Sequence, residues 1–106
     1  EARAKLPEWF GPLLADPSPL DNRWMQAYSV LTVCRMLYTV RHCVVVSKRA
    51  AKDWARQSLD PGWSGLIERA WHERRDSFLK ARQHSDPAEA AATVEFIRYG
   101  LAWAEC

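Results

Sequence analysis

The sequence predicts an all-α domain, a bundle of four to five helices, and three observations support this fold class. No segment keeps the period-two alternation of a half-buried strand for long, and residues 43–46 are the one short strand candidate. Apolar residues instead recur every three or four positions, which is the spacing of a helix face. Helix start signals divide the chain at residues 47, 60–61 and 86–87. At 106 residues the chain, 1–106, has the size of one domain with a single modest core.

The first forty residues are predicted to form an irregular lead-in and then one long helix. Pro7, Gly11 and Pro12 interrupt a weakly helical stretch, and Asp16-Pro17-Ser18-Pro19 is a clear break. Each proline removes a backbone donor and restricts the residue before it. We therefore expect residues 1–20 to be poorly regular, with the long helix following at about 22–40.

Three further helices are expected in the rest of the chain. Ser47 is a suitable N-cap for a helix at about 47–59. Asp60-Pro61 combines a cap with a first-turn proline and predicts a helix at about 61–82. Asp86-Pro87-Ala88-Glu89 is the strongest start signal and predicts a helix at about 87–104.

Most apolar residues of the last two helices need only a packing role. They follow helical spacing, which is more typical of a core than of a ligand site. Tryptophan buries a large area, so most of the six tryptophans are expected to pack. The two apolar stripes comprise Trp63, Ile67, Ala70, Trp71 and Phe78, and then Ala92, Phe96, Tyr99 and Trp103.

Composition excludes several classes of function. A net charge of +2 is too weak for a general nucleic-acid binder, and no apolar run is long enough to cross a membrane. Cys34, Cys43 and Cys106 lack metal or disulfide spacing and indicate reduced thiols in the cytoplasm. The chain has no histidine metal motif, no Gly-rich phosphate loop and no convergent carboxylates for Mg²⁺. We therefore expect neither a catalytic residue nor a metal site in this chain.

The long predicted helix carries an unusual second face. Polar and aromatic residues spaced by three or four form a stripe with apolar neighbours on both sides. One interpretation is a solvated face, or an arginine paired with a core carboxylate. The other is the wall of a cleft, with Arg35 directed at an anion, because the guanidinium fork binds phosphate in a bidentate manner. The stripe consists of Asp21, Met25, Tyr28, Thr32, Arg35 and Thr39.

The start of the next predicted helix is a second cationic position. Lys48 and Arg49 directly follow the predicted cap Ser47, where the helix dipole disfavours positive side chains. A solvent-facing basic helix would explain them, and so would a phosphate bound by Lys48 and the free backbone N–H groups. Arg35 and Lys48 together favour a polyphosphate ligand.

Three segments of the chain resemble the C-terminal helical domain of aminoglycoside nucleotidyltransferases, the streptomycin/spectinomycin adenylyltransferase group. The segments are Val30-Leu-Thr-Val-Cys-Arg-Met-Leu-Tyr-Thr-Val, Val45-Val-Ser-Lys-Arg-Ala-Ala-Lys-Asp-Trp-Ala and Leu66-Ile67-Glu68-Arg69-Ala70. The resemblance covers about residues 20–75 well, and the last helix fits only in character. The combination of the first two segments is specific for the family.

The resemblance implies the C-terminal domain of a two-domain nucleotidyltransferase. Because the chain begins at Glu1, without an initiator Met, we expect it to be a piece of a longer protein. The N-terminal nucleotidyltransferase domain, absent from this chain, would bring a Gly-Ser loop, an Asp-x-Asp pair for Mg²⁺ and the catalytic base. The implied reaction is transfer of AMP from Mg-ATP to a hydroxyl of an aminoglycoside or spectinomycin, which gives a bacterium antibiotic resistance. The implied ligands are ATP, Mg²⁺ and a small-molecule aminoglycoside, and we expect a monomer.

The resemblance also assigns roles to individual residues. Arg35 and Lys48 match the family's triphosphate contacts, and Asp21, Met25 and Tyr28 match its drug contacts. Asp21 keeps the family's acid and would attract a drug amine. Met25 and Tyr28 stand where the streptomycin-modifying type has an acid and a histidine, which favours spectinomycin or another acceptor. Arg41-His42-Cys43 replaces the Thr-Gly turn that is common in relatives, so the loop between these helices is expected to differ.

Two alternatives from other classes stay open at this point. One is a stand-alone helical ligand-binding or regulatory module that does not catalyse. The other is a helical ribonuclease of the type paired with minimal nucleotidyltransferases, which carries Arg-x-x-x-x-His. No arginine of this chain has a histidine five residues on, which counts against the ribonuclease.

Overall fold

The computed structural model describes residues 2–74 and 83–105, and their regular structure is entirely helical. The α-helices of these residues are α1 (Ala2–Ala15), α2 (Arg23–His42), α3 (Lys48–Ser58), α4 (Ser64–Glu73) and α6 (Pro87–Glu105). Two single 3₁₀ turns, η1 (Ser18–Leu20) and η2 (Pro61–Trp63), join them. The all-α fold class is confirmed.

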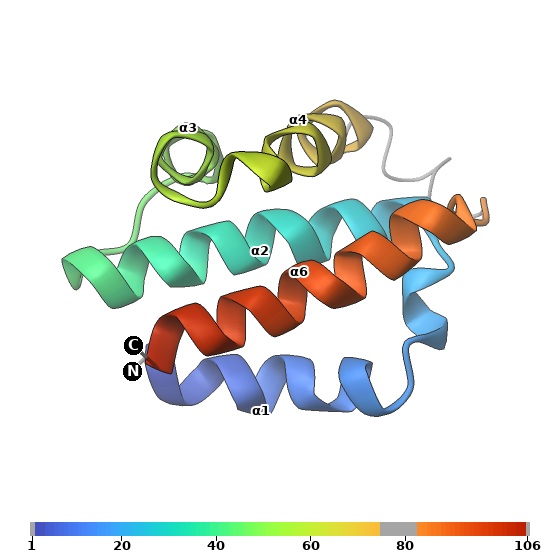
Figure 1. Cartoon of the computed structure of the whole chain (residues 1–106), viewed down its shortest axis with the longest axis horizontal. Helices are drawn as coiled ribbons and strands as arrows, with labels where there is room; N and C mark the ends of the chain where they lie inside the picture. The colour runs from blue at the N-terminus through green and yellow to red at the C-terminus, as the bar shows by residue number, and fades with distance from the viewer. Residues whose placement is uncertain (1, 75–82, 106) are drawn as a thin grey trace.

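Helix α2 is the central element of the bundle and contacts the other four helices (Figure 1). Helices α1 and α6 run along one side of it, and the two ends of the chain lie together. Helices α3 and α4 lie side by side on the opposite side of α2 and cross its direction, so that Figure 1 shows them nearly end-on. The outer stripe of α2 is therefore flanked by α1 below and by the α3–α4 pair above.

The core forms around the inner face of α2. Val30, Val33 and Leu37 of α2 pack against Phe96 and Ile97 of α6, and all five side chains are at most 1% exposed. Helices α2 and α6 pack closely at Gly100, where a Cβ atom would lie 2.9 Å from Val33 Cγ1. This packing fixes the position of α2, and so the place from which the side chains of its opposite face extend.

The structure differs from the predicted irregular lead-in, because Ala2–Ala15 form helix α1 despite Pro7 and Pro12. A proline inside a helix removes one hydrogen bond and costs about 3 kcal/mol. Leu6 and Phe10, one turn apart, are 1% and 3% exposed and lie in the core, so their burial offsets much of that cost. The prediction of an irregular lead-in was wrong, because it rested on the prolines and did not consider the apolar face formed by Leu6 and Phe10.

The segment predicted as a helix at 61–82 also differs at its start. Pro61–Trp63 form the 3₁₀ turn η2, in which Asp60 Oδ1 accepts a hydrogen bond from the Gly62 amide at 2.9 Å, and α4 begins only at Ser64. Helix α4 ends at Glu73, and Phe78 with the rest of that segment lies outside the described residues.

The α2–α3 connection is a loop. Cys43, the C-cap of α2, has a left-handed backbone with φ of 60°, and residues 43–46, the short strand candidate, are not in a strand.

Among the helices that the structure describes, none combines the length and the apolar character required to cross a membrane.

Candidate functional site

The outer stripe of α2 forms one wall of a surface groove. Asn22 caps α2 by accepting the Met25 amide at 2.8 Å, and from this start the helix aligns Tyr28, Thr32, Arg35 and Thr39 along one face. These side chains line a groove of about 490 Å³, together with Lys5 and Trp9 of α1, Met36 of α2 and Val45 of the α2–α3 loop. Four of the six stripe residues thus share one concave surface, as the cleft-wall interpretation expects.

Arg35 is half-buried in this wall and connects α2 to the loop that follows it. Its Nε donates a hydrogen bond to the Val46 carbonyl at 3.1 Å, and Thr39 Oγ1 donates to the Arg35 carbonyl at 3.0 Å. A guanidinium has five N–H donors. Among the described residues, Arg35 has no carboxylate partner, so its remaining donors are available to an anion.

Lys48 reaches the same region from the first position of α3. Ser47 caps α3 as predicted, with its Oγ accepting the Ala50 amide at 3.1 Å. The Lys48 ammonium lies 4.2 Å from the centroid of the Tyr28 ring, and the Trp24 ring stacks on Tyr28 with a centroid distance of 5.0 Å. A cation over an aromatic face is stabilised by the ring quadrupole.

The pKa of Lys48 is lowered by its surroundings. Burial lowers the pKa of the Lys48 ammonium below its ordinary value, and the positive charges of Arg35 and Arg74 lower it further. The fold therefore holds like charges together in a partly desolvated place. The structure brings together Arg35, Lys48 and Tyr28, three of the five residues predicted for the site.

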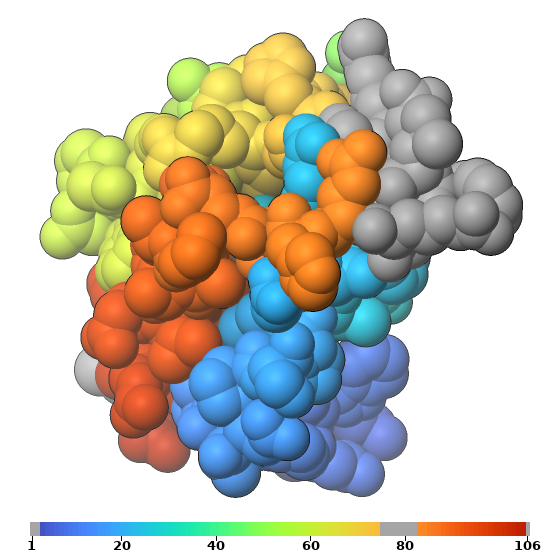
Figure 2. Space-filling model, turned by 90° about the vertical axis from the view of Figure 1, so that its right-hand side faces the viewer, coloured from blue at the N-terminus to red at the C-terminus, as the bar shows by residue number. Residues whose placement is uncertain are grey.

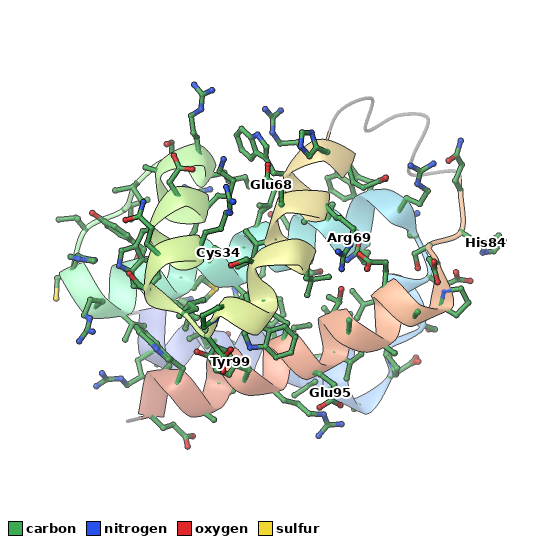
Figure 3. All side chains as sticks on the ribbon, turned by 45° about the horizontal axis from the view of Figure 1, so that its top comes forward. Cys34, Glu68, Arg69, His84, Glu95 and Tyr99 are labelled. Atoms are coloured by element: carbon green, nitrogen blue, oxygen red, sulfur yellow. The ribbon has the colours of Figure 1, made fainter. Side chains whose placement is uncertain are left out.

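The other two predicted residues, Asp21 and Met25, lie apart from this group. Asp21 precedes α2, at the end of η1, and its Oδ2 lies 2.7 Å from Nδ1 of His84. Figure 3 shows His84 at the outer edge of the molecule, and Figure 2 shows this end, where the start of α6 meets the η1 segment. Met25 is half-buried and packs against the core. The contact of Asp21 with His84 was not foreseen, since the pair is separated by more than sixty positions in sequence.

Three residues beside Lys48 were missed as site residues. Lys52, one turn further along α3, places its ammonium 4.8 Å from the Trp71 ring centroid and pairs with Asp53 at 2.9 Å. The guanidinium carbon of Arg74 lies 3.7 Å from the same centroid. The four-residue spacing of Lys48 and Lys52 was a readable signal. Trp71 and Arg74 are three residues apart and so share a helix face, but their position beside Lys48 was not predictable, because it depends on how α3 and α4 pack.

The described residues contain no group of three or more His, Cys, Asp or Glu side chains placed to hold a metal ion. Cys34 is fully buried, and burial raises the pKa of its thiol to about 12, so it is no nucleophile at neutral pH. The groove contains the cations Lys5 and Arg35 and the aromatic rings Trp9 and Tyr28, and such a lining suits the binding of anions and rings.

A protein-family model described as "Aminoglycoside adenylyltransferase, C-terminal domain" matches residues 3–100. The match includes every residue that lines the groove, from Lys5 to Val45, and also Lys48 and Arg74. Searches of curated proteins and of solved structures found no match.

Proposed function

Because this chain belongs to the family of aminoglycoside adenylyltransferase C-terminal domains, we propose that it binds nucleotide and acceptor in an enzyme that transfers AMP from ATP to a hydroxyl of an aminoglycoside or spectinomycin. The observation that supports this best is the meeting of Arg35 and Lys48, two cations held close together without a carboxylate partner among the described residues. Such a pair is unfavourable for the empty fold and favourable once it holds phosphate oxygens.

In this proposal the acceptor hydroxyl oxygen attacks the α-phosphorus of ATP, the bond from that phosphorus to the bridging oxygen breaks, and pyrophosphate leaves. The acceptor proton passes to a base of an N-terminal nucleotidyltransferase domain, the partner that a C-terminal domain of this family requires. Arg35 offers a fork of donors and Lys48 a point charge to the leaving phosphates, an electrostatic role. Mg²⁺ bound by the N-terminal domain would neutralise further phosphate charge when present.

The acceptor would lie on α2 beyond the phosphates. Tyr28 and the stacked Trp24 present aromatic surface next to Lys48, and Asp21 is exposed just before the start of α2, beside His84. Aromatic faces suit the apolar side of a fused or sugar ring, and the Asp21 carboxylate would attract an amine. Met25 and Tyr28 in place of an acid and a histidine favour spectinomycin or another acceptor over streptomycin.

The test joins this chain to a nucleotidyltransferase domain of the family and measures adenylylation. Arg35→Ala and Lys48→Ala should each lower kcat/KM about 10- to 100-fold, the loss expected for one charge-assisted hydrogen bond. Arg98→Ala is the matched control, because Arg98 is exposed on α6 and pairs only weakly with Glu95 at 3.7 Å. Unchanged kcat/KM in both site variants would refute the phosphate assignment.

The rival, a stand-alone binding module, is tested by calorimetry on the chain without the second domain. Half of a shared site should bind ATP and spectinomycin only weakly, with dissociation constants on the order of 1 mM. Micromolar binding of either compound would favour the stand-alone module.

A further inference from the structure

The turn between α3 and α4 places Arg74 next to the phosphate site. Helices α3 and α4 form a hairpin joined by η2, so the start of α3 lies beside the end of α4 (Figure 1). Lys48 opens α3, and Arg74 is the C-cap of α4. Between them, Lys52 and Arg74 both lie against the Trp71 ring, at 4.8 and 3.7 Å from its centroid. Arg74 thus belongs to the same cationic surface as Lys48.

The three acidic residues of helices α3 and α4 pair with cations other than Arg74. Figure 3 shows Glu68 between α3 and α4, where it pairs with Arg56 at 2.9 Å. In the part of the chain that the structure describes, no carboxylate pairs with Arg35, Lys48 or Arg74. The other two acids have partners of their own, Asp53 with Lys52 at 2.9 Å and Glu73 with Arg23 at 2.6 Å.

The contact with Trp71 also restricts the side-chain conformation of Arg74 before a ligand binds. A guanidinium that stacks on an indole loses little further side-chain freedom when it binds, and its N–H groups at the edge stay available. The side chain is exposed, so an anion can reach it from solvent. Its positive charge lowers the pKa of Lys48 together with that of Arg35, as expected for cations near Lys48.

We propose that Arg74, held against Trp71, is a third phosphate-binding cation of this site, and that the site therefore holds a chain of phosphates rather than a single one. This inference rests on the proposed function and adds a specificity-determining residue to it. Arg35, Lys48 and Arg74 come from three different helices, and three separate charges match the three phosphates of a nucleoside triphosphate tail better than one monophosphate. Arg74 distinguishes ATP from AMP in this arrangement.

The experiment titrates the chain with tripolyphosphate and with inorganic phosphate at low ionic strength, following amide NMR shifts. Arg74→Ala should weaken tripolyphosphate binding about tenfold, whereas binding of inorganic phosphate should change less than twofold. Arg74→Lys should restore part of the difference, because it keeps the charge and loses the stack. Arg98→Ala is again the matched control, since its partner Glu95 lies away from α3 and α4 in Figure 3.

A purely structural role of Arg74 at the helix end predicts a different pattern. In that case Arg74→Ala would lower the melting temperature and leave the ratio of the two affinities unchanged, which would overturn the proposal. Loss of tripolyphosphate binding in the Arg35 and Lys48 variants but not in the Arg74 variant would also overturn it and leave the proposed function intact. If the wild-type chain binds neither probe even at 10 mM (about ten times the expected dissociation constant), the proposed function and this inference fail together.

Discussion

Replacing Gly100 by alanine tests how tightly α2, the wall of the site, is held by α6. The new Cβ would lie 2.9 Å from Val33 Cγ1 and 3.7 Å from Leu37 Cδ1. Carbon atoms prefer about 3.5–4.0 Å, so the Val33 contact is too short by roughly 0.6 Å or more. Val33 is 1% exposed and has little room to move.

Two terms of opposite sign set the size of the effect. Alanine in place of glycine inside a helix gains about 1 kcal/mol from propensity. Overpacking a close-packed core costs about 1–3 kcal/mol. We expect Gly100→Ala to lower the free energy of unfolding by about 0–2 kcal/mol, whereas helix propensity alone would raise this free energy by about 1 kcal/mol.

A double-mutant cycle separates the two terms. Val33→Ala alone removes two methyl groups and should cost about 2 kcal/mol with its cavity. In that background the clash is gone, so adding Gly100→Ala should stabilise the chain by about 1 kcal/mol. The interaction energy of the pair is then about 1–3 kcal/mol, well above the scatter of about 0.5 kcal/mol for independent sites.

Urea unfolding, followed by helical circular dichroism, measures each free energy in this cycle. Ala91→Gly, at an exposed position of α6, provides the propensity term without the contact. If Gly100→Ala stabilises the chain by the same amount in both backgrounds, the close approach of α2 and α6 is not as described here.

Three further predictions concern other parts of the molecule. Lys48→Met should raise the melting temperature at neutral pH by up to a few degrees. The pKa of Lys48 is lowered on folding, so the unfolded chain binds more protons than the folded chain. The gain in stability of the Lys48→Met variant should therefore fade as pH rises through the lowered pKa towards 10.5, and a constant gain from pH 7 to 10.5 would contradict this prediction. Cys43, which is exposed, should react with a thiol reagent at once, whereas Cys34 should react only as the chain unfolds. Equal labelling rates of the two thiols, measured by mass spectrometry, would contradict the burial of Cys34. Thr93→Val should cost about 1–3 kcal/mol in urea unfolding, because it strands the buried Gln26 amide that donates to Thr93 at 2.7 Å, and adding Gln26→Leu should recover part of this loss; two additive losses would contradict that reasoning.

The starts of α3 and α6 were predictable because their capping chemistry is local. Ser47 caps α3, and Asp86 Oδ1 accepts the Ala88 amide at 2.8 Å where α6 begins, both as the sequence indicates. The long helix expected at about 22–40 is observed as Arg23–His42. Each of these signals acts within one turn of chain, so a single sequence contains all of it.

What the sequence could not reveal depends on contacts between distant segments. Helix α1 persists because Leu6 and Phe10 find a core that other helices build, and propensity alone cannot report that. Arg74 joins Lys48 only because η2 reverses the chain between them. Arg35 and Lys48, by contrast, were predictable as a pair, since a short loop connects the two helices that carry them.

The two faces of α2 connect the stability of the domain with its proposed ligand. The inner face fixes α2 through Val33 and Leu37, and α3 packs against α2 with Ala51 and Ala55 buried in the core. Arg35 on α2 and Lys48 on α3 therefore have little freedom to move apart. An anion that binds the pair relieves the repulsion between their charges and should stabilise the fold by RT ln(1 + [L]/Kd). Lys48→Met should remove both effects at once, giving a chain that is more stable when empty and that gains little from tripolyphosphate.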